Sequence, residues 1–223
     1  MTIQDHFTNP GASARQRPFL NARLALSHTG RAKRAMDLLI AIPALILCLP
    51  LFALIALAIA LDSRGPVLFS QQRLGQGGKP FAIFKFRTMR VLEDGMHVVQ
   101  ACKNDVRITR IGSFLRSTSL DELPQLLNVV LGSMSLVGPR PHAVAHDKLY
   151  GALIADYSQR QRAKPGITGW AQINGARGAT PTTEDMRKRV DLDIWYVDNA
   201  NLILDLRILL RTPLEVLRQR NAY

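Results

Sequence analysis

Two adjacent acids, Asp121 and Glu122, stand where a helical pattern begins, and their types are suited to phosphate chemistry. Ser119 precedes Glu122 by three residues, a capping-box spacing that predicts a helix from about Leu120 to about Gly132. In the first helical turn both carboxylates can reach a site at the helix N-terminus, where backbone N–H groups favour phosphate. One carboxylate could attack phosphorus and the other could hold Mg²⁺. By spacing alone, an ordinary helix cap is the more common explanation.

Two basic residues, Lys85 and Arg87, alternate with Phe84 and Phe86 in a strand-like string. Alternation on a strand places the two cations on one face and the two aromatic rings on the other. The cations could clamp a diphosphate while the rings pack or touch lipid. A solvated basic strand above a core explains the same pattern equally well.

Arg140 lies between Pro139 and Pro141. Two prolines restrict the backbone around the arginine, which lowers the entropy cost of presenting it to a ligand. Arginine is suited to bidentate contacts with phosphate. A surface turn remains the alternative interpretation of this motif.

Three further titratable residues lie in the second half of the chain. Asp193 could serve a metal or orient a base, or it could form a helical salt bridge with Arg187 or Arg189. His142 and His146 have metal-ligand spacing on a helix, but no carboxylate or cysteine is placed to complete such a site. We therefore expect the two histidines to lie on the surface.

Short strand-like and helical segments alternate beyond residue 64 and must position these side chains. Val67 to Gln71 and Phe81 to Phe86 are typical of strands around a glycine-rich turn. Besides the helix after Leu120, helical patterns cover residues 143–161, 182–197 and 202–218. We expect residues 64–223 to form a compact, helix-rich α/β domain.

An uncharged apolar run from Leu38 to Leu61 precedes this domain. As a straight helix it would extend roughly 36 Å at ~1.5 Å per residue, enough to cross a hydrocarbon core of ~30 Å. Pro43 and Pro50 lie inside the run and tend to kink a helix. Both flanks are basic, which favours the cytoplasm for both ends. We therefore expect residues 31–63 to form a re-entrant anchor helix broken at Pro50, with a single span as the alternative.

The overall charge is strongly positive, because 29 Lys and Arg face 17 Asp and Glu for a net charge of +12. Such a balance indicates a polyanionic partner: nucleic acid, an anionic membrane or a phosphorylated substrate. The basic residues form no single stripe and accompany no base-stacking motif, so we expect no nucleic acid. Residues 1–30 are polar and basic, and we interpret them as a mobile arm.

Five strings in this chain together resemble the bacterial sugar transferases, the monotopic polyprenyl-phosphate phosphoglycosyl transferases that initiate exopolysaccharide or glycan assembly. The strings are KRAMD from Lys33, GPVLFSQQRLGQGGKPFAIFKFRTM from Gly65, SLDELPQLLNVVLGSMSLVGPRP from Ser119, KPGITGWAQINGARG from Lys164 and DIWYV from Asp193. The similarity extends from about Lys33 to Pro213, and the long strings are far more specific than a single acid pair.

This resemblance implies an enzyme that transfers a sugar-1-phosphate from a UDP-sugar to undecaprenyl phosphate and releases UMP. Family members are taken to follow a ping-pong mechanism through a phosphosugar on the Asp of an Asp-Glu pair, with Mg²⁺ on the Glu. Asp121 and Glu122 match that pair. The implied substrate-binding residues are Lys85 and Arg87 on the basic strand, Arg140 in the Pro-Arg-Pro motif, and Asp193.

The resemblance also implies a membrane setting: lipid contact at the bacterial inner membrane, with the catalytic domain facing the cytoplasm. The family's anchor breaks at a Ser-Pro pair, whereas this chain has Leu49-Pro50, so the proline is kept and the serine hydroxyl is lost. The sugar and the oligomeric state, including a homo-oligomer, stay open.

Two rival functions follow from the residues themselves. A non-catalytic membrane adaptor would bind anionic lipid or a partner through its basic surface and would tolerate Asp121→Asn. A membrane-tethered nucleic-acid binder would show steeply salt-dependent DNA binding without any need for UDP-sugar.

Overall fold

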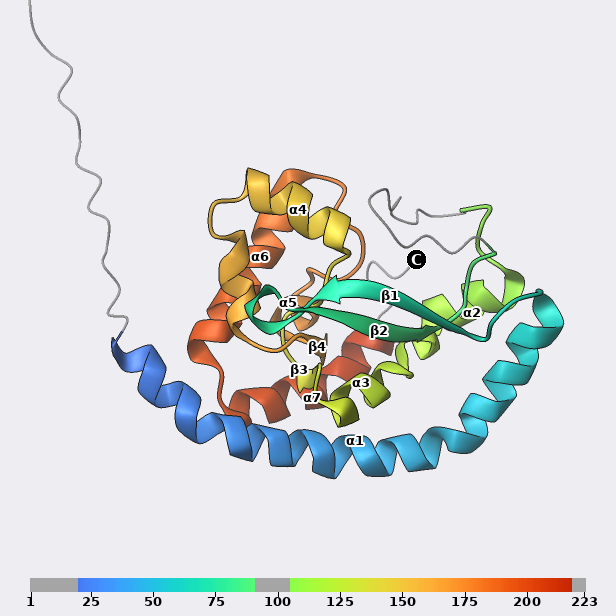
Figure 1. The fold of residues 1–223 in the computed structure, drawn as a ribbon, viewed down its shortest axis with the longest axis horizontal. Helices are drawn as coiled ribbons and strands as arrows, with labels where there is room; N and C mark the ends of the chain where they lie inside the picture. Colours follow the sequence, from blue (N-terminus) through green and yellow to red (C-terminus); the bar gives the residue numbers. More distant parts are fainter. Residues whose placement is uncertain (1–19, 91–104, 218–223) are drawn as a thin grey trace, which may run out of the picture.

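The computed structural model describes residues 20–90 and 105–217. Helices of four to 43 residues pack with a two-stranded hairpin and a small second sheet (Figure 1). The α-helices are α1 (Leu20–Asp62), α2 (Arg110–Thr118), α3 (Gln125–Leu131), α4 (Val144–Leu153), α5 (Trp170–Ile173), α6 (Thr183–Asn199) and α7 (Leu202–Leu217). The strands are β1 (Leu68–Leu74), β2 (Pro80–Phe86), β3 (Ser135–Val137) and β4 (Gly166–Thr168), and the 3₁₀ turns are η1 (Gln76–Gly78), η2 (Leu120–Glu122) and η3 (Tyr157–Arg162).

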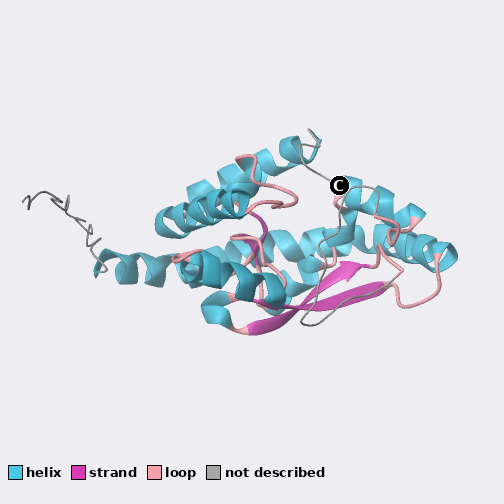
Figure 2. Ribbon diagram, turned by 90° about the horizontal axis from the view of Figure 1, so that it is seen from above, coloured by secondary structure: helices cyan, strands magenta, loops and turns pink. Residues whose placement is uncertain are grey.

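The two sheets confirm the helix-rich α/β class. β1 and β2 pair antiparallel, with Phe69 opposite Lys85, and β3 and β4 pair parallel, with Ser135 opposite Gly166. Figure 2 shows the β1–β2 hairpin along one edge of the helical body rather than at its centre. The hairpin therefore presents residues to the site from the side, while the helices provide most of the core.

Most of the expected elements are confirmed, with one correction at the acid pair. The two strands form the β1–β2 hairpin, and α6 and α7 occupy the ranges expected for the last two helices. The expected 143–161 helix is divided into α4 and η3. The capping box at Ser119 is wrong: Ser119 adopts left-handed φ 59° and ψ 18°, makes no capping bond, and ends α2. The next α-helix therefore begins at Gln125, and it ends at Leu131 with Gly132 as its C-cap, close to the expected end.

Helix α1 is the one helix among the described residues that is long and apolar enough to cross a membrane, because an 18-residue window within Gly30–Asp62 has a mean hydropathy of 2.9. It runs as a single helix through Pro43 and Pro50, so the expected break at Pro50 is not seen. In Figure 1 it is an arc with the rest of the domain on its concave side. The arm expected over residues 1–30 lies outside the described residues up to residue 19, and helix α1 begins at Leu20.

Charged side chains attach the first half of α1 to the domain. Lys33 Nζ lies 2.6 Å from Asp205 Oδ2 on α7, and Arg34 donates to the carbonyl oxygens of Val129 and Val130 at the end of α3. The buried Asp37 accepts from Leu136 N at 3.0 Å. The string that begins at Lys33 therefore fixes α1 against three different elements.

The main hydrophobic core fills the space between α1, α3, β3 and α7. Ala41 of α1 is fully buried against it, together with Val129 of α3, Val137 of β3 and Ile208 of α7. A second cluster joins the far end of α1 to the hairpin and α2. Burial of apolar side chains is the main force that holds elements together, so both halves of α1 belong to the folded domain.

Candidate active site

The acid pair lies in a short turn between two helices. Helix α2 ends at Ser119, η2 follows, and Glu122 N donates to Ser119 O at 3.2 Å. Among the described residues, Ser119 is the only non-glycine with positive φ, a conformation that costs ~1–2 kcal/mol. Arg177 Nη2 donates to Ser119 Oγ at 2.5 Å and helps to hold it. We call residues 119–122 the catalytic turn.

Glu122 is neutralised by two cations. Lys85 Nζ lies 2.7 Å from Oε1, and Arg140 makes a two-pronged contact with 2.9 Å from Nη1 to Oε2 and 2.5 Å from Nη2 to Oε1. Burial alone would raise the pKa of Glu122, but Arg140 and Lys85 outweigh it and hold the pKa well below its usual range. Glu122 is therefore ionised, and it gathers two cations at one point.

Asp121 differs from its neighbour. Its side chain is only 8% exposed, yet it makes no hydrogen bond or ion pair with any described residue. Burial, and then the charge of Glu122, raise the pKa of Asp121 to about 6. A carboxylate that is buried, unpaired and more basic than usual is available for chemistry at neutral pH.

The position of Lys85 depends on Asn128, which sequence reasoning missed. Asn128 is buried on α3, and its side-chain amide bonds β2 at both Phe84 N (2.9 Å) and Ala82 O (2.7 Å). The amide thus replaces a neighbouring strand along this edge of β2. Because α3 follows the catalytic turn directly, these two bonds fix Lys85 relative to Glu122.

Arg140 is positioned by Arg160, which the sequence also gave no reason to single out. Arg160 Nη2 donates to Arg140 O at 2.5 Å, and its Nε and Nη2 reach Asp193 Oδ2 at 2.9 and 2.7 Å. Burial would lower the pKa of Arg160, but Asp193 outweighs it and the pKa is raised. Asp193 is therefore paired with Arg160, not with Arg187 or Arg189, and it reaches the site through Arg160.

His142 belongs to the same buried group, and the expected surface position is wrong. Its Nδ1 lies 2.6 Å from the Tyr157 hydroxyl, which donates to Asp147 Oδ1 at 2.6 Å. Burial, and then the charge of Arg160, hold the pKa of His142 well below its usual range, so the ring is neutral. We call Asp147, His142, Tyr157, Arg160 and Asp193 the Arg160 cluster.

Arg87 lies apart from Lys85, in contrast to the shared face expected from alternation. β2 ends at Phe86, and the buried Arg87 guanidinium donates to Arg64 O at 2.9 Å and Ser63 O at 2.6 Å. These carbonyls follow directly on α1, whose C-terminal end carries partial negative charge. Arg87 therefore fixes the end of the apolar helix. Of the six residues singled out, Asp121, Glu122, Lys85 and Arg140 meet, whereas Arg87 and Asp193 do not join them.

The donor set suits Mg²⁺ only in company with a substrate. Among residues 20–90 and 105–217, no group of three His, Cys, Asp or Glu side chains converges. Mg²⁺ commonly takes one or two carboxylates together with substrate phosphate oxygens, and Asp121 with Glu122 offers two. The pair therefore fits a metal shared with a phosphorylated ligand.

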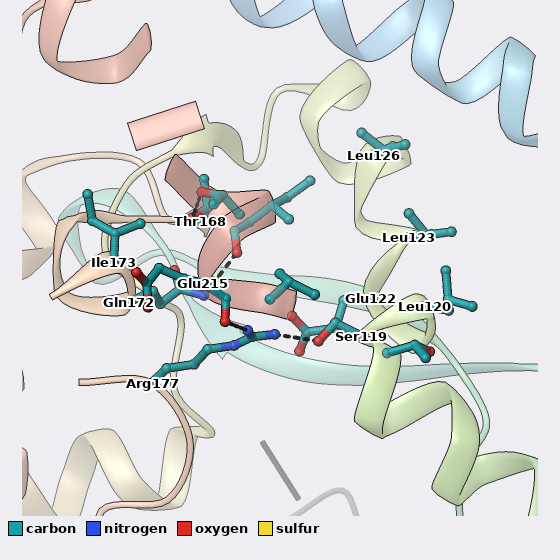
Figure 3. A pocket seen from close by; sticks show the side chains of 14 residues that line it. Ser119, Leu120, Glu122, Leu123, Leu126, Thr168, Gln172, Ile173, Arg177 and Glu215 are labelled. Atoms are coloured by element: carbon teal, nitrogen blue, oxygen red, sulfur yellow. Dashed lines mark hydrogen bonds between the residues drawn. The ribbon is translucent and has the colours of Figure 1, made fainter. Parts of the chain in front are cut away.

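A cavity of about 260 Å³ adjoins the catalytic turn (Figure 3). Ser119 and Glu122 contribute to its wall, together with leucines of η2 and α3, residues of β4 and α5, and the end of α7. Arg177 lies at one end, bonded to Ser119 Oγ and, at 3.3 Å, to Glu215 O. The lining is mostly apolar, so this space differs in character from the charged group around Glu122.

Comparison with known proteins places these features in context. A model of the bacterial sugar transferase family matches residues 28–219. The chain is 51% identical over 191 residues to a UDP-glucose:undecaprenyl-phosphate glucose-1-phosphate transferase of Escherichia coli (86% of this chain, 41% of the relative). It is 53% identical over 191 residues to a protein of the same name from Caulobacter vibrioides (86% and 72%).

The lengths of these relatives differ. The chain is 46% identical over 195 residues to the exopolysaccharide production protein PSS of Rhizobium leguminosarum (86% of this chain, 98% of the relative). It spans about two fifths of the Escherichia coli relative. The family model, which matches residues 28–219, includes the catalytic turn and α1 from residue 28 onward.

Proposed function

Because the chain belongs to the bacterial sugar transferase family, we propose that it transfers a sugar-1-phosphate from a UDP-sugar to undecaprenyl phosphate and releases UMP. This would be the first membrane step of exopolysaccharide or glycan assembly. Two of the relatives above are named for UDP-glucose, so UDP-glucose is the donor we propose. An activity of this kind needs a nucleophile, charge neutralisation at phosphorus and access to lipid.

The observation that carries the proposal is the difference between the two acids of the catalytic turn, Asp121 and Glu122. Asp121 is unpaired and Glu122 is fully paired, which suits one acid to attack and the other to organise charge. In the first half-reaction, Asp121 forms a bond to the phosphorus that bears the sugar, and the bond from that phosphorus to the UMP oxygen breaks. In the second half, the acceptor phosphate attacks the same phosphorus and Asp121 is released as a carboxylate.

Lys85 and Arg140 are the cations that we assign to the diphosphate. Both already converge on Glu122, so an anionic substrate at this point would meet preorganised donors. Glu122, with Asp121 beside it, would hold Mg²⁺, which when bound would supply further positive charge to the phosphoryl oxygens. The contacts of Arg87 and Asp193 support positioning roles at the end of α1 and behind Arg140.

The anchor is proposed to enter and leave the membrane on its cytoplasmic side, at the inner membrane. Arg34, before the apolar run, bonds α3, and Ser63, after it, is bonded by Arg87 of the same domain. A straight span would carry these two ends to opposite faces of the bilayer. Cysteines placed one at a time at Gly30 and Ser63 in a cysteine-free variant should therefore react with an impermeant thiol reagent only from the cytoplasmic side.

The decisive experiment measures UMP release from UDP-glucose with undecaprenyl phosphate and Mg²⁺ in detergent or nanodiscs. Wild type should release UMP, and Asp121→Asn should lower the rate at least ~10³-fold. Asp191→Asn, at an exposed acid on α6, is the matched control and should retain activity. A fully active Asp121→Asn would contradict the mechanism, and inactivity with every UDP-sugar would favour the membrane adaptor.

A further inference from the structure

We propose that the cavity beside the catalytic turn binds the head of the lipid acceptor. The acceptor phosphate would lie at Arg177, and the first isoprene units would lie against the leucines of η2 and α3. This inference rests on the proposed function and adds to it the place where the second substrate binds.

The lining of the cavity favours a hydrocarbon chain over a nucleotide. Leu120, Leu123 and Leu126 form one wall, Ile173 contributes from α5 and Val216 from α7. None of the described residues that line the cavity is aromatic, so a nucleobase would find no ring to stack on. Its Thr168 and Ser119 hydroxyls are already engaged, with Thr212 and Arg177 respectively. A chain without hydrogen-bonding groups loses nothing in such a space.

Arg177 makes one end of the cavity positively charged, whereas the rest of the lining is mostly apolar. Arg177 is held by Ser119 Oγ and Glu215 O, and its guanidinium still offers donors beyond these two bonds. The charges of Arg140, Glu122 and Asp121 all act on it, which places it close to the catalytic turn. Burial lowers the pKa of Arg177 more than any neighbouring charge does, so a phosphate bonded to its guanidinium would offset part of the cost of burying that charge.

The opposite end of the cavity lies towards the membrane helix. Figure 3 shows Leu126 on the side of α1 and Arg177 away from it. Leu126 shares the main core with Ala41 of α1, and Leu120 packs against the cluster that contains Ile59 of α1. The apolar wall of the cavity therefore stands directly behind the packing surface of the apolar helix.

The size of the cavity limits what it can enclose. Its volume of about 260 Å³ lies below the ~300–1,000 Å³ of sites that enclose a whole drug-sized ligand. Only the head of a long polyprenyl chain would fit, and the remaining isoprene units would stay in lipid. Such partial enclosure suits a lipid acceptor, which must leave the cavity after it has received the sugar-1-phosphate.

The first test fills the cavity from α7. Val216→Trp adds bulk to the lining, while Leu214→Trp adds the same bulk two residues earlier at an exposed position. We expect Val216→Trp to raise KM for undecaprenyl phosphate by about tenfold or more and to leave UMP/UDP-glucose exchange without acceptor unchanged. Leu214→Trp should change neither. If Val216→Trp instead loses exchange and raises KM for UDP-glucose, the donor binds in the cavity. If KM is unchanged for both UDP-glucose and undecaprenyl phosphate, neither substrate binds there. Either result overturns the inference.

The second test measures binding of the lipid phosphate without turnover. A photoreactive short-chain polyprenyl phosphate should label peptides that contain residues 120–126 and 212–216, and undecaprenyl phosphate should compete. Arg177→Gln should weaken this labelling by about tenfold, and Arg177→Lys should restore part of it. Labelling confined to other peptides overturns the inference. Because labelling needs no turnover, it decides the inference even if wild type releases no UMP, which would count against the proposed function instead.

Discussion

The catalytic turn and the Arg160 cluster both gather buried charges, yet they treat their acids differently. In the Arg160 cluster each acid has a short partner: Asp193 has Arg160, and Asp147 has the Tyr157 hydroxyl. In the catalytic turn the cations converge on Glu122 and Asp121 is left unpaired. A concentration of charge alone therefore does not mark the reacting group. Under the proposed function, the reacting group is the unpaired acid beside a fully paired one.

The two regions are also connected, because Arg160 bonds the backbone of Arg140 while the Arg140 side chain bonds Glu122. The Arg160 cluster thus lies behind the catalytic turn and bonds the backbone of Arg140. Substitutions in the two regions should accordingly separate loss of activity from loss of stability.

The sharpest contrast is between Asp121→Asn and Asp193→Asn at pH 7. Asp121→Asn should abolish activity yet raise stability by ~1–3 kcal/mol, because it removes a buried charge. Asp193→Asn should lower stability by ~3–5 kcal/mol, because it removes the counter-charge 2.7 Å from the buried Arg160 and leaves only Asp147, at 3.9 Å, among the acids that the structure describes. Thermal melting of both variants checks this, at ~2–4 °C per kcal/mol for a chain of this size. Equal destabilisation of the two would show that Asp121 is a structural acid.

A weaker effect on activity is expected from a substitution of Arg160, which lies behind Arg140. Arg160→Lys keeps the charge but cannot bond Asp193 and Arg140 O in the same geometry, so kcat/KM for UDP-glucose should fall by about 10²-fold. Arg162→Lys, which alters a half-exposed pair with Asp198, is the matched control and should have little effect. If kcat/KM were unchanged although Arg160→Lys had lost stability, the cluster would support the fold without positioning Arg140.

Lowering the pH should reduce kcat/KM more gradually than these substitutions do. Asp121 must be ionised to attack, and its pKa is raised to about 6, so kcat/KM should fall about tenfold per pH unit below 6 and level off above it. The same raised pKa means that ionisation is less favourable in the folded state. Stability should therefore decline as pH rises from about 4 to about 6, and the advantage of Asp121→Asn should disappear below pH ~4. A pH–rate profile with melting curves checks both signs.

The smallest effect concerns Mg²⁺ in the presence of UMP, a phosphorylated ligand of the proposed site. With UMP present, saturating Mg²⁺ should raise the melting temperature of wild type by a few degrees beyond UMP alone, and chelation should reverse the rise. Glu122→Gln should show no shift, whereas Asp193→Asn, away from the pair, should keep it. A shift of equal size in Glu122→Gln would place the metal elsewhere.

Local patterns predicted much of the fold because they rest on neighbouring residues. Alternation around the glycine-rich turn gave the hairpin, and the helical pattern over residues 182–197 gave α6, which has Thr182 as its N-cap. The capping-box spacing predicted a helix start wrongly at Ser119, because α2 ends there in a left-handed residue that a bond from Arg177 helps to hold. Ser119 and Arg177 are 58 positions apart in the sequence, so the residues next to Ser119 do not indicate this bond.

The site was predictable where one motif carried it and not where distant elements met. Asp121, Glu122, Lys85 and Arg140 followed from the family's strings. The position of Arg87 depends on carbonyls at the end of α1, more than 20 residues earlier, and that of Asp193 on Arg160, 33 residues away. His142 looked like a surface residue because nothing nearby in the chain indicates Tyr157, which covers it.

The bond between Lys33 and Asp205 also sets an order of events during synthesis. Lys33 leaves the ribosome 172 residues ahead of Asp205, an interval of roughly 10–35 s at ~5–20 residues per second. Until then Lys33 and Arg34 have no domain to bind, and their charges act only as the basic flank of the apolar run. Under the proposed function, the orientation of the apolar helix in the membrane would therefore be set before the domain folds. The same two side chains then attach the folded domain to α1, so one pair of residues serves first the nascent chain and then the folded protein.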